Sequence, residues 1–174
     1  MITDYQPAIF RKTILPAAAL VLFAIALSPH SLFAQGRVFW QEGGVVLCER
    51  TWCARLAAVS DSSGGAIVVW ADTRGNHESV WAQRVDRDGN VMWQRNGVLL
   101  RNNNWSPRNF SAVSDGSSGM IAAWLEYNAG PFARQITAQR VDSGGTVLWG
   151  PTGVVVIGSN VGRGFETSMV SDGR

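Results

Sequence analysis

Beyond residue 34, short apolar runs alternate with clusters of glycine, aspartate, asparagine and serine. Runs of this length that are rich in valine, isoleucine and tryptophan predict β-strands, and no sustained 3.6-residue apolar period predicts a helix. The clearest stretch predicts four strands, the last interrupted at Asn96-Gly97: residues 56–60, 66–71, 79–85 and 91–100. The second of these is apolar throughout, which is typical of a strand buried on both faces. We therefore expect an all-β fold.

A tryptophan followed four residues later by a glycine marks a longer period in the same region. The tryptophans are Trp40, Trp93 and Trp149, which lie 53 and then 56 residues apart. A second block, Ala-Val-Ser-Asp at residues 58–61, returns at 112–115 and, as Met-Val-Ser-Asp, at 169–172. Three ordered appearances of one pattern indicate an internal repeat.

A third block, Ala-Gln-Arg-Val-Asp at residues 82–86, returns at 138–142 and completes the repeat. We place the repeat domain at residues 35–174, with units near 48–100 and 101–156 and partial units at both ends. Four strands in a unit of about 50 residues favour an antiparallel blade, so we expect a partial β-propeller.

Several residues of the first unit also match the pattern of a known family. They are Ser60-Asp61, Gly64-Gly65, Trp70, Asp72, Arg74, Ala82-Gln83-Arg84, Asp88-Gly89-Asn90, Trp93 and Gly97. This pattern resembles that of bacterial secreted propeller-type repeat proteins, and the resemblance spans roughly residues 36–174. It implies a blade architecture and export but no particular reaction. The second unit departs from it, with Glu126 and Asn128 where Asp72 and Arg74 stand.

The first 34 residues differ from the rest of the chain. Arg11 and Lys12 precede an apolar run from Ile14 to Leu27, and Ala34 is a small residue at the exit. A charged start, a short apolar middle and a small-residue exit predict a secretory signal peptide at residues 1–34. The alternative is an uncleaved N-terminal anchor, which would be the chain's contact with a membrane. We expect the repeat domain to be secreted, whether extracellular, periplasmic or on the cell surface.

Export changes how the two cysteines are interpreted, because exported proteins meet an oxidising environment. Cys48 and Cys53 are close in sequence and suit a small structural disulfide, with two free thiols as the alternative. A zinc site would need two further ligands, and His77 is the single histidine beyond the signal.

The place where the sequence ends suggests a fragment. Ser171-Asp172 matches the end of a first strand, and propellers typically close with four to eight blades. We expect a truncated gene or a piece of a longer protein, and closure through oligomerisation is the alternative.

Charge and aromatic residues narrow the function further. The formal net charge is +2, and the basic residues are scattered, which excludes the basic stripe of a nucleic-acid-binding protein. Tryptophans that recur with the repeat are expected in the core. Trp52 and Trp105 instead fall in connections between units, where loops often carry function, and they are the candidate ligand-facing residues, with local packing as the alternative.

Acidic residues do not define a metal or catalytic site. Asp86-x-Asp88 resembles part of a calcium loop, but the second unit lacks the second carboxylate, which favours plain turn chemistry. His77 has no matching serine motif for nucleophilic catalysis. We expect no catalytic residue and no cofactor.

These features predict an exported non-enzymatic repeat scaffold, with binding or structural duties outside the cell and a glycan or a cell-surface protein as partner. The alternative is a fragment of a secreted propeller glycoside hydrolase or other glycan-active enzyme, whose catalytic acids would lie either in missing blades or in Glu126 and its loop.

Overall fold

The computed structural model describes residues 40–41, 43–49, 52–128, 134–158 and 166–172. The chain divides after Val38, so all the described residues belong to the unit that begins at Phe39. The predicted secretion signal, residues 1–34, lies outside the described part. Within that part, no helix has the length and apolar character needed to cross a membrane.

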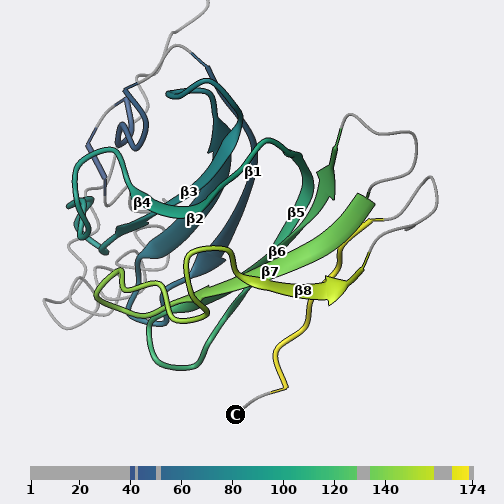
Figure 1. Cartoon of the computed structure of the whole chain (residues 1–174). Helices are drawn as coiled ribbons and strands as arrows, with labels where there is room; N and C mark the ends of the chain where they lie inside the picture. The colour runs from purple at the N-terminus through teal and green to yellow at the C-terminus, as the bar shows by residue number, and fades with distance from the viewer. Residues whose placement is uncertain (1–39, 42, 50–51, 129–133, 159–165, 173–174) are drawn as a thin grey trace, which may run out of the picture. The chain divides into compact units, whose positions relative to one another are not determined.

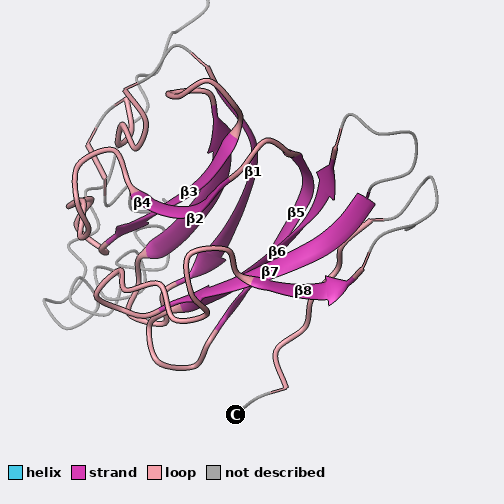
Figure 2. Cartoon of the chain, in the orientation of Figure 1, coloured by secondary structure: helices cyan, strands magenta, loops and turns pink. Residues whose placement is uncertain are grey.

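The described residues form two four-stranded antiparallel sheets and contain no helix (Figures 1 and 2). Neighbouring strands in each sheet are consecutive in sequence. The first sheet contains β1 (Cys53–Ser60), β2 (Ala66–Asp72), β3 (Ser79–Val85) and β4 (Val98–Asn102). The second contains β5 (Ser106–Ser114), β6 (Met120–Tyr127), β7 (Arg134–Val141) and β8 (Val154–Ile157). The expected all-β class is confirmed.

The fourth strand is shorter than its sequence predicts. It begins at Val98, and upstream of it Val91 makes one isolated bridge to Val85. Around Trp93 and Gln94, the side chain of Gln83 makes hydrogen bonds in place of backbone strand pairing. Its Oε1 accepts a hydrogen bond from the amide of Trp93 (3.0 Å), and its Nε2 donates to the carbonyl of Gln94 (2.8 Å). A side chain that bonds the backbone in this way competes with strand pairing.

The turn after β1 is organised by a buried aspartate. Asp61 accepts hydrogen bonds from the amides of Ser63 (2.8 Å) and Gly65 (2.7 Å) and from Arg84 Nε on β3 (3.0 Å). Burial raises the pKa of the Asp61 carboxyl, but these hydrogen bonds and the charge of Arg84 outweigh it and leave the pKa below its ordinary value.

Asp115 has the same role after β5. It accepts hydrogen bonds from the amides of Ser117 and Gly119 and from the guanidinium of Arg140. Burial again raises the pKa of this carboxyl and the hydrogen bonds lower it by more. Each sheet therefore fixes its first turn to its third strand through one Asp–Arg ion pair.

A buried apolar cluster joins the two sheets. The first sheet contributes one face of β2 and β3 with Trp93 and Leu100, and the second contributes the face of β6 that carries Trp124. The full buried set is Ile67, Val69, Val80, Ala82, Trp93, Leu100, Met120, Ala122, Trp124 and Val141. Burial of this apolar surface is what holds the sheets together.

The recurring tryptophans do not all share the core environment expected for them. Trp70, Trp93 and Trp124 are buried, with at most 8% of their surface exposed. Trp149 differs, since 36% of its surface is exposed. Trp93 is covered by the second sheet, whereas none of the described residues covers Trp149 to the same degree.

Candidate binding groove

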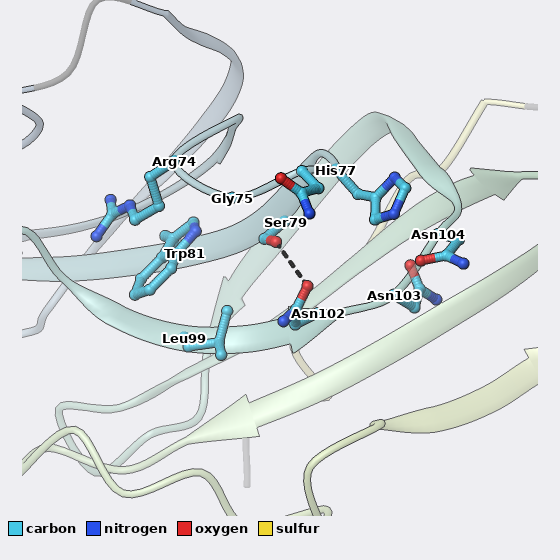
Figure 3. A pocket seen from close by; sticks show the side chains of 10 residues that line it. Arg74, Gly75, His77, Ser79, Trp81, Leu99, Asn102, Asn103 and Asn104 are labelled. Atoms are coloured by element: carbon cyan, nitrogen blue, oxygen red, sulfur yellow. Dashed lines mark hydrogen bonds between the residues drawn. The ribbon is translucent and has the colours of Figure 1, made fainter.

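A groove lies where the loop before β3 meets the end of β4 (Figure 3). It consists of two adjoining hollows of about 490 and 480 Å³ that share Leu99 and Asn102. The first is lined by Arg74, Gly75, Asn76, His77, Ser79, Trp81, Leu99, Asn102, Asn103 and Asn104. The second is lined by Leu99, Asn102, Val147, Gly150, Pro151 and Thr152, so both sheets contribute to the groove.

Trp81 and Arg74 form the aromatic end of the groove. The guanidinium carbon of Arg74 lies 3.5 Å from the centroid of the Trp81 ring, which is a cation–π contact; Figure 3 shows the two side chains next to each other. Arg74 Nε also donates to both carboxylate oxygens of Asp72 (3.0 and 2.9 Å). The charge of Arg74 is therefore balanced within the protein and does not demand an anionic ligand.

The Trp81 ring also carries an unsatisfied donor. Its Nε1 is buried and has no hydrogen-bond partner among the described residues. Leaving such a group unpaired costs about 1–3 kcal/mol, and its burial keeps Nε1 from direct contact with a ligand in the groove.

Amide side chains form the polar wall. Ser79 Oγ donates to Asn102 Oδ1 (3.1 Å), as Figure 3 shows. Asn103 Oδ1 accepts from the amide of Trp105 (3.1 Å), which shapes the connection between the sheets. Asn104 is exposed. Asparagine offers both donors and acceptors, and the lining includes no carboxylate. The groove thus suits a neutral ligand with many hydroxyl or amide groups.

The two tryptophans that the sequence singles out are not part of this lining. Trp52 is 42% exposed, and the Arg55 guanidinium lies 5.2 Å from its ring centroid. Trp105 is half-buried, and its backbone amide is held by Asn103. Trp105 does, however, lie in the same connection as Asn103 and Asn104, so the loop containing one of the two predicted residues also supplies part of the groove.

Cys48 and Cys53 are joined by a disulfide, with their Cα atoms 6.8 Å apart. Together with Asp72 they place three potential metal-ligand atoms within 4.8 Å of one another. Thiolates, rather than disulfide sulfurs, bind metal ions. Since Asp72 is also bound by Arg74 and Trp70, the cluster is suited to a structural role.

In the turns that begin at Asp86 and Asp142, the aspartate side chain accepts hydrogen bonds from backbone amides of the same turn. Asp86 Oδ1 accepts hydrogen bonds from the amides of Asp88 (2.9 Å) and Asn90 (2.8 Å). Asp142 Oδ1 does the same for Gly144 (2.9 Å) and Thr146 (2.8 Å). The Asn90 side chain and amide also lower the pKa of the Asp86 carboxyl. The same geometry in both sheets, with and without a second aspartate, matches turn chemistry.

Glu126, the position considered for a hydrolase, is 1% exposed. Its oxygens accept hydrogen bonds from Trp124 Nε1 (3.0 Å) and Thr137 Oγ1 (2.9 Å), and Arg101 Nε lies 2.9 Å away. A carboxylate so enclosed ties β4 of the first sheet to β6 of the second and has no open path to a substrate.

Sequence reasoning missed Trp81 and the three consecutive asparagines as a site. The available signal was the difference between the two units, since the Trp81 position carries no tryptophan in the second unit. Comparison with protein-family models, curated proteins and solved structures finds no match for this chain.

Proposed function

We propose that this chain is an exported, non-enzymatic repeat scaffold of propeller-type blades that binds a neutral glycan in the Trp81 groove. The observation that carries the proposal is the lining itself, which combines a tryptophan, four asparagines, a serine and a histidine without a carboxylate. Aromatic rings pack against sugar rings, and amides match the donor and acceptor capacity of sugar hydroxyls.

The length of the groove supports a chain-like ligand rather than a single ring. Its two hollows share Leu99 and Asn102, and their combined space exceeds what one small ring fills. The second hollow has a more apolar wall around Val147 and Pro151, which suits the less polar faces of sugar residues.

The blade architecture is supported by the two consecutive antiparallel sheets and the apolar cluster between them. Export is supported by the N-terminal sequence pattern and by the Cys48–Cys53 disulfide, which an oxidising compartment maintains. A binding role is favoured over a glycoside hydrolase because Glu126 is enclosed by partners.

A glycan array of neutral and acidic oligosaccharides, followed by calorimetric titration of the best neutral binder, tests this function. His77→Ala and Asn104→Ala change exposed groove residues, so we expect weaker binding without loss of folding. Trp52→Ala and Trp105→Ala are the controls, because neither side chain lines the groove.

An array without any neutral glycan binder would refute the proposed ligand. Binding that survives His77→Ala and Asn104→Ala but fails with Trp52→Ala or Trp105→Ala would move the site to the loops that the sequence indicated.

A further inference from the structure

Two side chains of the first sheet bind the turn at residues 142–146 of the second sheet. Trp93 Nε1 and Arg84 Nη1, both from the first sheet, donate to the carbonyl of Ser143 in the second (3.0 and 3.1 Å). The Trp93 indole also lies against Gly145, at 2.9 Å from where a Cβ would stand. The turn at residues 142–146 therefore binds an indole and a guanidinium presented by the preceding sheet.

The second sheet carries a tryptophan and an arginine at the same positions, Trp149 and Arg140, and both are more exposed than their counterparts in the first sheet. Trp149 stands where Trp93 stands in the first unit, and its amide is likewise bound, by Gln139 Oε1 (3.0 Å). Yet Trp149 is 36% exposed against 8% for Trp93. The side chain of Arg140 is 36% exposed against 13% for its counterpart Arg84.

The strand beside Trp149 is uncovered as well. All four residues of β8, from Val154 to Ile157, are between 45% and 59% exposed. At the matching end of β4, Leu100 is 1% and Arg101 is 9% exposed. We call Arg140, Leu148, Trp149 and residues 154–157 the Trp149 face. An uncharged, exposed apolar strand at a sheet edge is rarely left unpaired by soluble proteins.

The first sheet carries a turn that accepts an indole at this position. A Cβ on Gly89, in the turn at residues 86–90, would lie 3.4 Å from the Trp40 ring. Trp40 is the tryptophan that precedes the first unit, as Trp93 precedes the second. One chain therefore holds both halves of a further joint, the Trp149 face at one end and the Gly89 turn at the other.

We propose that the Trp149 face binds the Gly89 turn of a second copy of this chain, head to tail, and that Trp149 displaces Trp40 of that copy. This contact would continue the joint between the two sheets, because the Trp149 face offers the same donor types, an arginine and a tryptophan, and the two turns share a first aspartate and a glycine three residues later. Because the two surfaces differ, the contact is heterologous and extends to further copies.

The test measures the oligomeric state by sedimentation velocity over a range of concentrations. The full chain is expressed, and mass spectrometry identifies the N-terminal residue of the purified protein. The wild type and every variant are compared with the same N-terminal residue. We expect concentration-dependent self-association, weakened at least about tenfold by Trp149→Ala. Trp40→Ala should strengthen it, because the competing indole is removed. Trp105→Ala is the control and should leave it unchanged.

A wild type that stays monomeric over the whole range would overturn the proposal. So would self-association that is insensitive to Trp149→Ala, which would indicate unspecific pairing through β8, or weakened association in Trp40→Ala. Circular dichroism of each variant separates these outcomes from unfolding, and the exposed position of Trp149 makes its substitution mild. Glycan binding does not enter this readout.

Discussion

The indole of Trp93 occupies the space beside Gly145, so that a Cβ added to this glycine would lie 2.9 Å from the ring. Gly145 also has a φ of +89°, which other residues adopt at a cost of about 1–2 kcal/mol. Gly145→Ala should therefore lose both the backbone preference and the packing of Trp93.

Gly150→Ala is the matched control, since Gly150 has a φ of +72° and nothing within 4 Å of an added Cβ. We expect Gly145→Ala to lower the free energy of unfolding by about 1–3 kcal/mol more than Gly150→Ala, as overpacking does. Urea denaturation measures both. Equal losses would show that the Trp93 contact contributes nothing.

Acid should destabilise the fold through Asp61 and Asp115. Both carboxyls have a pKa below the ordinary value of 3.8 in the folded chain, so the folded state favours their charged forms. The stability they contribute is present above the unfolded pKa and is lost as pH falls through the lower folded pKa.

The measurement is the urea midpoint between about pH 5 and pH 2, compared between the wild type and the double variant Asp61→Asn/Asp115→Asn. The variant should be less stable at neutral pH and should lose less stability on acidification. Identical slopes in the two proteins would contradict the role of these carboxyls.

Arg101 compensates the buried charge of Glu126 across the joint between the sheets. Arg101→Met leaves that carboxylate without its cation, and breaking a buried pair from one side costs about 3–5 kcal/mol. Adding Glu126→Gln should recover much of this loss, because the amide oxygen still accepts from Trp124 and the amide nitrogen can donate to the Thr137 hydroxyl, which reverses the direction of the present bond. A double variant less stable than Arg101→Met alone would be inconsistent with this account.

Reduction of the Cys48–Cys53 disulfide should have a modest effect. The bond closes a loop with a sequence separation of 5, and a loop that short accounts for about 2 kcal/mol. Mass spectrometry after alkylation, with and without reductant, checks the bond, and denaturation checks its contribution. Free thiols that react in the unreduced folded protein would show that the bond is absent in solution.

Local sequence patterns predicted the strands where backbone pairing alone decides the structure. β3 has the predicted bounds of residues 79–85, because a short run with two valines and a tryptophan lies between two strong turn signals. β4 was predicted too long, because the bonds of Gln83 to Trp93 and Gln94 depend on tertiary contact and leave no periodic trace.

The candidate groove was harder to predict for the same reason. Trp81 and Asn102 belong to neighbouring strands, and Asn103 and Asn104 belong to a connection, so only the fold shows that they line one hollow. Comparing the two units excludes residues that occur in both from the candidate binding residues. The same comparison selects loop tryptophans such as Trp52, which does not line the groove. Trp149 shows a second limit of comparing units. It occupies the same sequence position as Trp93 but is more exposed, because its neighbours in the structure differ.

The acceptor at the joint between the sheets is the main-chain carbonyl of Ser143, which receives both Trp93 and Arg84. Every amino acid supplies that carbonyl, and the corresponding position of the first unit is an arginine, Arg87. Mutations at this position can accumulate over evolution without loss of the joint, provided that the glycine two residues later is kept. The second sheet's share of this joint therefore depends on a main-chain carbonyl and a glycine, and the side chain at position 143 can change without removing either.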